Sequence, residues 1–419
     1  MNLFDDLRQR GLIQDHTDPD ELRADLGAGM VTFYVGFDPT AASLHVGSLV
    51  QLLTARRLQF AGHRPLLLVG GATGQIGDPS GKASERELNA PEVVAGWVER
   101  IRAQVAPFVT YDGANGAVLV NNLDWTGDLS AIEFLRDVGK HFPVNRMLAR
   151  EVVKARLETG ISFTELSYQL LQANDFYELH RRHGCTLQFG GSDQWGNITA
   201  GVDYIRRRGA GPVHAFTTPL VTKADGTKFG KSETGTVWLD PELTSPYAFY
   251  QFWVNVEDRD VVPYLKYFSF RDHDELAELE KATVERPAAR AAQRALAEEL
   301  TSLVHGAEEC GQVIAASRAL FGRGQLPDLA PATLRSALAE AGLTEVHGDL
   351  PSVTTLLRET GLAASLSDAR RTVAEGGAYL NNERITDGEA VVPSSALLHG
   401  RWLVLRRGKR SIAGVELVH

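Results

Sequence analysis

The fold of this 419-residue chain is decided by the stretch Gly36-Phe-Asp-Pro-Thr-Ala-Ala-Ser-Leu-His-Val-Gly-Ser48. A β-type run, Met30-Val-Thr-Phe-Tyr-Val35, precedes it, and a helical run from Leu49 to Ala61 follows it. A strand that ends in a turn and enters a helix near His45 presents free backbone N–H groups and the positive end of a helix dipole. Such an end suits a phosphate group. An ordinary strand-to-helix turn explains these residues equally well.

The region from residue 30 to about 240 alternates strand-like and helical segments. This alternation predicts an α/β fold, with a Rossmann-like, mostly parallel sheet and helices on both of its faces. Ligands then bind at the carboxyl ends of the strands. The expected strands are 31–35, 65–70, 117–121, 186–189 and 214–220, and the expected helices are 49–61, 91–107, 129–138, 163–183 and 194–207.

After Pro246 the strand signals stop and helical runs continue to about residue 320, including a long Ala-, Glu- and Arg-rich run from Pro287 to Phe321. A compact unit follows, with helical runs at 353–360 and 367–375 and strand-like runs at 378–380 and 401–405. The predicted domains are a Rossmann-like catalytic domain at 1–240, an α-helical domain at 241–325, a linker at 326–351 and a small α+β domain at 352–419.

The charge distribution limits the choice of partners. The net charge of −10 argues against general binding along nucleic acid, and we expect no DNA partner. Residues 352–419 hold 9 Lys+Arg against 7 Asp+Glu, a net charge of +2, whereas the remainder holds 34 against 46 and carries −12. A slightly basic end on an acidic body is compatible with local RNA binding.

Hydrophobicity and cysteine content favour a cytoplasmic protein. The chain is 43% hydrophobic, but no apolar run reaches the roughly 20 residues that a membrane helix needs. The charged start, Met1 to Arg10, lacks the apolar core of a signal peptide. Cys185 and Cys310 lie in different regions and suggest neither a disulfide framework nor a metal cluster.

A second functional stretch is Lys223-Ala-Asp-Gly-Thr-Lys-Phe-Gly-Lys-Ser232. Lys228 and Lys231 lie three residues apart on a polar loop behind the turn Asp225-Gly226. Flexible ammonium groups on such a loop can follow phosphate oxygens as their charge develops. A solvated hairpin with incidental lysines is the alternative.

Three polar residues lie on one face of the predicted helix 163–183. Tyr168, Gln172 and Asp175 stand at i, i+4 and i+7, which places them within about 60° of one another at roughly 100° per residue. This stripe is either a solvated helix face or one wall of a polar pocket.

The two loop stretches together resemble the ATP signatures of class I aminoacyl-tRNA synthetases, usually written HIGH and KMSKS. Further motifs resemble those of the bacterial tyrosyl-tRNA synthetases, and this resemblance extends through nearly the whole chain. They are Tyr34-Val-Gly-Phe-Asp38, Gly70-Gly-Ala-Thr-Gly-Gln-Ile-Gly-Asp78, Asn121-Asn-Leu-Asp-Trp125 and Gln188-Phe-Gly-Gly-Ser-Asp-Gln-Trp-Gly-Asn197. Residues 352–419 resemble an RNA-binding fold also found in a small-subunit ribosomal protein, matched from Leu366 to Asn382.

The resemblance implies a role for each candidate residue. Tyr34 and Asp175 would bind the phenol hydroxyl of tyrosine, and Tyr168, Gln172 and Asp78 its α-ammonium group, in a site that also includes Gln188. Gly191 and Asp193 would bind the ribose of ATP, and Gln194 would lie at the reacting phosphate. Catalytic roles fall to Thr40, His45, Lys228 and Lys231 at the departing phosphates, and to Lys82 and Arg86 on a covering loop; Asp38 and Ser48 complete the ATP site.

The resemblance further implies a homodimer that charges tRNA(Tyr), with ATP as a substrate accompanied by magnesium and no protein metal motif. One departure is Ser48, where the first signature usually ends in a second histidine. Ser48 still donates and accepts hydrogen bonds. Two other readings are a tryptophanyl-tRNA synthetase, against which Tyr34 with Asp175 argues, and a non-catalytic RNA-binding regulator, against which His45 and the two lysines argue.

Overall fold

The computed structural model describes residues 2–80, 89–150, 153–154, 160–227, 229–232, 235–408 and 411–418, with the backbone alone at 231 and 232. The chain folds into two compact units. The first comprises Met1–Asp240 and Glu257–Lys281, and the second Pro241–Val256 and Ala282–His419. The four-part division expected from the sequence remains a prediction.

The first unit is built on a five-stranded parallel sheet whose order is β3-β2-β1-β4-β5. The strands are β1 (Thr32–Phe37), β2 (Arg64–Val69), β3 (Val118–Asn121), β4 (Leu187–Gly191) and β5 (His214–Thr218). Each coincides with a predicted strand to within a few residues, so the predicted α/β fold class is confirmed. β1 lies at the centre because both of its neighbours, β2 and β4, pair with it in parallel register.

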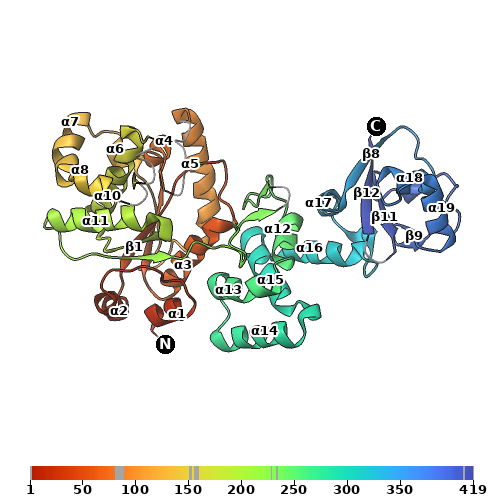
Figure 1. Ribbon diagram of the computed structural model, residues 1–419, viewed down its shortest axis with the longest axis horizontal. Helices are drawn as coiled ribbons and strands as arrows, with labels where there is room; N and C mark the ends of the chain where they lie inside the picture. Colours follow the sequence, from red (N-terminus) through yellow and green to blue (C-terminus); the bar gives the residue numbers. More distant parts are fainter. Residues whose placement is uncertain are drawn as a thin grey trace. The chain divides into compact units, whose positions relative to one another are not determined.

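Helices cover both faces of this sheet (Figure 1). α3 (Leu49–Phe60) and α5 (Pro91–Val105) lie against one face, and α10 (Phe163–His183) and α11 (Trp195–Arg207) pack together on the other. Tyr34 of β1 shares a buried cluster with Phe176 of α10. These four helices also match the predicted ones. The predicted helix 129–138 is instead a short helix, α7 (Ala131–Glu133), followed by a π-helical turn, η3 (Phe134–Val138).

Shorter elements complete the first unit. Two helices precede β1, and two others, in the segment Glu257–Lys281, return to this unit after the second unit has begun. Buried Arg10 and Arg57 both donate to the Ser269 carbonyl, which fixes this returning segment to the sheet domain. The elements are α1 (Leu3–Gln9), α2 (Pro19–Ala28), α4 (Thr73–Ile76), α6 (Leu123–Thr126), η4 (Gly139–His141), α8 (Val144–Leu148), α13 (Asp258–Phe268) and α14 (His273–Glu285).

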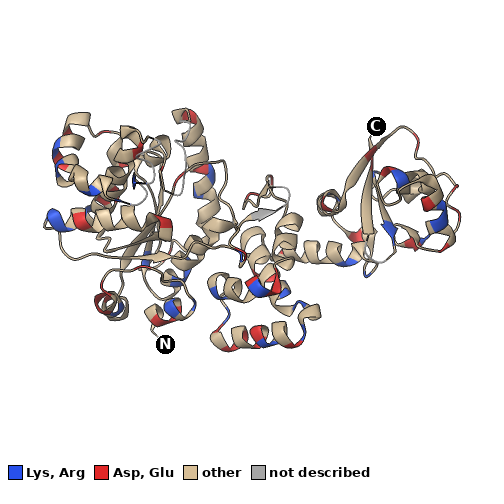
Figure 2. Cartoon of the chain, viewed as in Figure 1, with Lys and Arg blue, Asp and Glu red and all other residues tan. Residues whose placement is uncertain are grey.

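The second unit combines helices with a mixed sheet of order β10-β9-β11-β12-β8. Its helices are α12 (Pro246–Val254), α15 (Ala291–His305), α16 (Ala307–Leu320), α17 (Pro331–Ala341), α18 (Val353–Glu359) and α19 (Leu366–Ala374). Its strands are β8 (Leu343–His347), β9 (Ala378–Leu380), β10 (Glu383–Arg384), β11 (Trp402–Arg407) and β12 (Ser411–Val418). Basic and acidic residues both lie on and around α19 (Figure 2), where Arg371 pairs with Asp368 and Arg370 pairs with Glu389.

Two features of this unit differ from the sequence expectation. The run 287–321 is interrupted at Gly306, whose φ of 95° ends α15 before α16 begins. Within the expected linker 326–351, strand β8 pairs in parallel with β12, and Val346 joins the buried core of the sheet. A five-residue strand that gains its partner only at the end of the chain leaves little periodic signal in the sequence.

Within the described ranges, no helix is both long and apolar enough to cross a membrane. Both cysteines are free thiols in buried positions. Burial raises the pKa of the Cys185 thiol far above its usual value, as expected for a packing residue.

Candidate functional site

A cavity of about 170 Å³ opens at the carboxyl ends of β1 and β4, beneath α10. Every residue that the sequence assigned to a tyrosine site lines it, and so do two of those assigned to ATP, Asp38 and Gln194. The assigned tyrosine residues are Tyr34, Asp78, Tyr168, Gln172, Asp175 and Gln188. The stripe on α10 is therefore a pocket wall and not a solvated face.

The sheet provides the floor of this cavity. Tyr34 and Gln188 are register partners on β1 and β4, so their side chains leave the same face of the sheet. Gly36 follows two residues after Tyr34 and presents the same face. A Cβ at Gly36 would meet only Leu68, at 3.7 Å, so the missing side chain keeps the space beside Tyr34 open.

A continuous chain of hydrogen bonds lines the pocket. The Tyr168 hydroxyl donates to Asp38 Oδ2 (2.6 Å), and Thr73 donates to Asp38 Oδ1 (2.7 Å). The buried Asn122 amide donates to Thr73 Oγ1 and to Asp175 Oδ2, both at 2.9 Å. Asp38 and Asp175 are thereby held in fixed orientations by groups that are themselves bonded.

Asp175 is a buried carboxyl group with its donors already in place. Its second oxygen accepts from the Trp125 indole at 2.8 Å. Burial raises the pKa of Asp175 to about 7, although the hydrogen bonds from Asn122 and Trp125 lower it. Burial, assisted by Asp175, also raises the pKa of the Tyr34 hydroxyl, which keeps that hydroxyl a neutral donor. This end of the cavity can recognise a polar hydrogen on a ligand.

Three buried polar atoms face the cavity without a partner among the described residues. They are Tyr34 Oη, Gln172 Oε1 and Gln188 Oε1. A buried polar atom left unpaired costs about 1–3 kcal/mol. A ligand with matching polar groups removes this cost, so the three atoms indicate a ligand-binding pocket.

The opposite end of the cavity is closed by Asp78. Its carboxylate accepts from the Ser80 backbone N–H (3.0 Å), from the Gln194 amide and from the Asn197 amide (3.4 Å). Nearby Asp193 has its pKa raised by burial and then by the charge of Asp78. Negative charge at this end favours a cationic group on the ligand.

The two ATP signatures, distant in sequence, meet in the first unit. The Val46 N–H donates to the Val237 carbonyl (3.0 Å), and the Leu239 N–H donates to the Leu44 carbonyl (2.9 Å). Residues 237–239 directly follow the hairpin formed by β6 (Lys231–Ser232) and β7 (Gly235–Thr236). The first ATP signature therefore lies beside residues 237–239, which follow the second ATP signature in the chain.

His45 is oriented by its own turn. The Gly47 N–H donates to His45 Nδ1 at 3.0 Å, which places the proton of a neutral imidazole on Nε2, and no residue in the described ranges accepts it. The loop shields part of this otherwise exposed ring, and the desolvation lowers the pKa of His45. A Cβ at Gly47 would lie 2.7 Å from His45 Cε1, so a larger residue there would displace the His45 ring.

The remaining predicted residues divide into two groups. Thr40 is exposed in the loop after β1, Ser48 precedes α3 without capping it through its side chain, and Gly191 ends β4. The others lie wholly or partly outside the described residues: Lys82, Arg86 and Lys228 entirely, and Lys231 with its side chain.

Sequence reasoning missed several residues of the site. Thr73, Asn122 and Trp125 lie in motifs that supported the resemblance, but nothing in the sequence assigned them a contact. Gln104 of α5 was also missed: its carbonyl accepts from the Leu44 N–H (2.8 Å), and its amide donates to Ser43 Oγ (3.0 Å). An amphipathic helix such as α5 gives no sign of which polar residue reaches a distant loop.

The chain matches two family profiles. Residues 28–322 match class I tRNA synthetases (W and Y), and residues 334–413 match the Tyrosine–tRNA ligase SYY-like C-terminal domain. Full-length relatives include the tyrosine–tRNA ligases of Streptomyces griseus, 64% identical over 419 residues, and Mycobacterium tuberculosis, 59% identical over 420 residues. Each alignment covers 99% of both chains.

Solved structures agree in fold. A C-terminally truncated mitochondrial tyrosyl-tRNA synthetase of Aspergillus nidulans has a TM-score of 0.70 and 32% identity, covering 76% of this chain and 94% of its own. A tryptophanyl-tRNA synthetase of Plasmodium falciparum has a TM-score of 0.54 at 14% identity, covers 79% of this chain and 87% of its own, and shares the fold alone. With its paired ATP signatures and its polar pocket, the chain belongs to the tyrosine–tRNA ligases, a family of class I aminoacyl-tRNA synthetases.

Proposed function

We propose that the 170 Å³ cavity binds L-tyrosine with its phenol hydroxyl between Tyr34 and Asp175. The observation that carries this proposal is the set of buried, unpartnered atoms that face the cavity, together with a carboxyl group whose existing donors fix it in place. Phenylalanine in this site would leave Tyr34 and Asp175 without the partner that the hydroxyl provides, and the unpaired groups would oppose its binding.

The amino group of the substrate is assigned to the Asp78 end. Tyr168 and Gln172 face this region from α10, and Asp78 supplies the negative charge. Tyrosine held in this direction has its carboxylate near Gln194, which donates to Asp78 and lines the same cavity. We assign Gln188 to the floor of the tyrosine site on the basis of its unpaired carbonyl oxygen.

ATP is assigned to the adjoining loops. Asp193 and Gly191 would hold the ribose, while Thr40, His45, Lys228 and Lys231 would stabilise the β- and γ-phosphates as pyrophosphate departs. The Nε2–H of His45 is a suitable donor for this purpose. Lys82 and Arg86 would cover the transition state, and Asp38 and Ser48 would border the nucleotide.

The first chemical step requires no side-chain base, because the tyrosine carboxylate is already ionised at neutral pH. It attacks the α-phosphate of ATP, and pyrophosphate leaves. The enzyme contributes orientation of the reactants and stabilisation of phosphate charge. Magnesium would accompany ATP on its phosphate oxygens, because Mg²⁺ keeps several of its water ligands and binds mainly through substrate phosphates.

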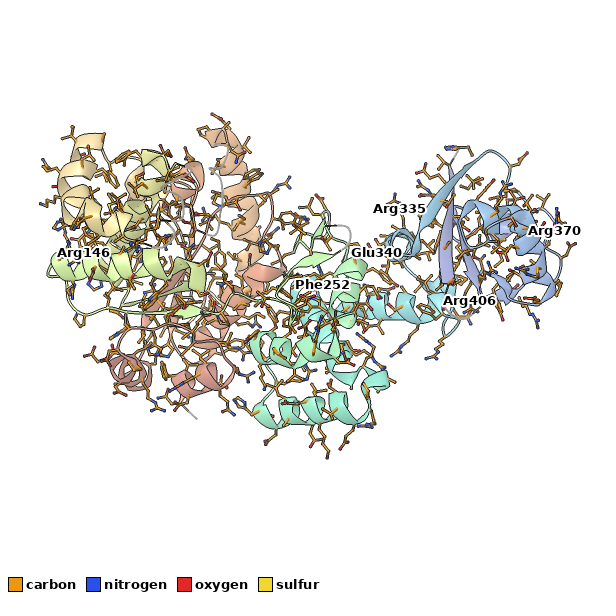
Figure 3. All side chains as sticks on the ribbon, viewed as in Figure 1. Arg146, Phe252, Arg335, Glu340, Arg370 and Arg406 are labelled. Carbon is orange, nitrogen blue, oxygen red and sulfur yellow. The ribbon has the colours of Figure 1, made fainter. Side chains whose placement is uncertain are left out.

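tRNA(Tyr) is the second substrate, and we infer contacts from both units. Arg206, Arg207 and Arg208 end α11, and Arg146 of α8 lies exposed near them (Figure 3). These cations suit the acceptor stem. In the second unit, Arg370 on α19 and Arg406 on β11 (Figure 3) are candidates for phosphate contacts. The Asn381 amide donates to the Ala396 carbonyl and accepts from the Val404 N–H, so this side chain stabilises the fold of the unit.

A homodimer is supported by exposed apolar side chains on neighbouring elements. Ile132, Leu135, Val144 and Phe163 are 51–71% exposed. The elements that carry Leu135, Val144 and Phe163 share one buried cluster around Val138, Met147 and Leu170. Ile132 lies on α7, which directly precedes and contacts η3. Patches of this kind mark protein interfaces. Sedimentation of the protein and of an Ile132→Asp, Val144→Asp variant tests this; a monomeric wild type contradicts it. The substrates of the reaction support a cytoplasmic location.

Pyrophosphate exchange tests the proposed substrate directly. Exchange of labelled pyrophosphate into ATP is measured with tyrosine, tryptophan and phenylalanine in turn. Exchange that depends on tyrosine alone supports the proposal. Preference for tryptophan would reassign the cavity, and absence of exchange with any of the three would favour a non-catalytic regulator.

A further inference from the structure

Helix α13 is hydrogen-bonded to the lysine loop, residues 222–230, which contains the start of the second ATP signature. The Ala224 N–H donates to Asp260 Oδ1 at 2.7 Å, and the Tyr264 hydroxyl donates to the Thr222 carbonyl at 3.1 Å. Asp260 and Tyr264 lie four residues apart on α13 and so share one face of the helix. Both side chains are buried, and burial raises the pKa of the Tyr264 hydroxyl far above its usual value, so that hydroxyl remains a donor.

The same helix also holds the lysine loop after Lys228. Phe229 follows Lys228 in the chain, and its ring packs against the rings of Tyr264 and Phe268, with 5.0 and 5.7 Å between the ring centroids. Tyr264 therefore contacts the loop twice, through its hydroxyl before Lys228 and through its ring after Lys228. The residues on both sides of Lys228 are thus attached to α13.

The turn between these attachments is closed by its own hydrogen bonds. The Lys223 N–H donates to the Thr227 carbonyl at 3.0 Å. Thr227 donates to Asp225 Oδ1 through its N–H (2.9 Å) and through its hydroxyl (2.6 Å). Because the turn is closed in this way, a shift of Ala224 also shifts Thr227, which directly precedes Lys228.

α13 is itself attached to the helix that carries the first ATP signature. Arg57 of α3 donates to the Ser269 carbonyl at the carboxyl end of α13. α3 begins directly after Ser48, the last residue of the first signature. Both signatures are therefore attached to the pair formed by α3 and α13, and the distance between the signatures depends on these two helices.

We propose that Asp260 and Tyr264 are positioning residues for tyrosyl-adenylate formation, which hold the lysine loop where its ammonium groups meet the departing pyrophosphate. This inference rests on the proposed function of Lys228 and Lys231. Asp260 and Tyr264 do not line the tyrosine cavity, so they act through the loop and not on tyrosine. An ammonium group stabilises phosphate charge only from the correct position, so a small shift of the loop slows the reaction.

Two variants remove the attachments, and each has a matched partner. Tyr264→Phe removes the hydroxyl and keeps the ring against Phe229. Tyr267→Phe makes the same change on the same helix, where the hydroxyl has no hydrogen bond among the described residues. Asp260→Ala removes the acceptor of the Ala224 N–H, whereas Asp260→Asn retains an oxygen that can accept it. Stopped-flow measurement over a range of ATP concentrations gives the rate of adenylate formation, and equilibrium binding gives the tyrosine affinity.

We expect Tyr264→Phe to slow adenylate formation by roughly three- to tenfold and Asp260→Ala by roughly ten- to a hundredfold, with tyrosine affinity within about twofold of wild type. Asp260→Asn should recover most of the lost rate, and Tyr267→Phe should match the wild type. Tyr264→Phe preserves the packing and tests the proposal independently of the fold of Asp260→Ala. A rate in Tyr264→Phe that equals the rate in Tyr267→Phe overturns the proposal, and so does a loss of tyrosine affinity as large as the loss of rate.

A background without the two lysines decides whether the effect passes through the lysine loop. In the Lys228→Ala, Lys231→Ala enzyme, Tyr264→Phe should change the remaining rate by less than about twofold, because no ammonium group is left to position. The same slowing with and without the lysines overturns the proposal, because Tyr264 would then act by another route. Failure of the proposed function is distinct: removal of the two lysines alone would then leave the rate of adenylate formation unchanged.

Discussion

Gly230 in the second ATP signature packs directly against Val46 in the first. A Cβ built on Gly230 would lie 3.0 Å from Val46 Cγ2, and the Gly230 backbone has a φ of 82°. The Gly230 carbonyl also accepts from the Val237 N–H (3.0 Å), the residue whose own carbonyl pairs with Val46. The two signatures are thus joined at a point where only glycine fits.

Gly230→Ala is expected to slow tyrosyl-adenylate formation by roughly ten- to a hundredfold, because the added methyl group displaces the loops by a fraction of an ångström. Tyrosine affinity should remain unchanged, since the tyrosine cavity lies elsewhere. Stopped-flow measurement of adenylate formation checks this. Gly62→Ala is the matched control: Gly62 has a φ of 99° and open space around it, so it shares the backbone strain without the contact. Equal slowing in both variants would contradict the role of this contact.

The free energy of unfolding of Asp175→Asn, taken relative to that of the wild type, should increase as pH rises. The folded-state pKa of about 7 lies above the unfolded value of about 3.9, so the folded state holds the proton more tightly. Wild-type stability is therefore lost between about pH 4 and pH 7, by up to roughly 4 kcal/mol. Asparagine does not titrate. Denaturant unfolding at pH 4.5 and pH 8 measures the free energy of unfolding of both proteins. If the difference between the two proteins is the same at both pH values, Asp175 ionises normally.

Tyrosine affinity should rise with pH across the same range. In the proposed orientation, the substrate hydroxyl would donate to ionised Asp175 and favour its charged form, so protonation of Asp175 should weaken tyrosine binding. We expect about tenfold tighter binding at pH 8 than at pH 6. Isothermal titration at the two values gives the measurement. Asp175→Ala should bind tyrosine weakly and almost without pH dependence, and should lose the preference over phenylalanine; a similar pH slope in this variant would assign the titration to another group.

Gln104→Leu should raise the KM for ATP and slow adenylate formation while tyrosine affinity is kept. Gln104 connects α5 to the residues before His45, and Ser43 also accepts from the Asp240 N–H. Because Gln104 and Ser43 form one network, the effects of Gln104→Leu and Ser43→Ala should not add in a double-mutant cycle. Arg102→Leu on the exposed side of α5 is the control. Additive effects would mean that the two residues act separately.

Removal of residues 343–419 should abolish tRNA charging and spare adenylate formation. The cut is placed before β8, because a cut at 352 would leave that strand without its partner β12. Exchange and charging assays on the truncated chain decide the matter, with circular dichroism to confirm retained helix content. Undiminished charging would make this region a structural cap.

Much of the first unit was determined by local sequence alone. The five strands and four major helices were predicted closely because apolar periodicity and turn residues act over a few positions. The stripe of Tyr168, Gln172 and Asp175 followed from helical spacing in the same way. Their combination with Tyr34 came from the resemblance, and the cavity brings them together.

Tertiary structure alone decided the rest. Asn122 and Trp125 hold Asp175 through contacts across about 50 residues of sequence, and β8 becomes a strand only when β12 pairs with it. The two ATP signatures likewise indicate phosphate binding from the sequence, but the sequence does not show that they lie close together in the fold. Local sequence determines which segments fold into strands and helices. The contact of Gly230 with Val46 and the complete pocket depend instead on pairing between distant segments. That pairing depends on the packing of the whole sheet.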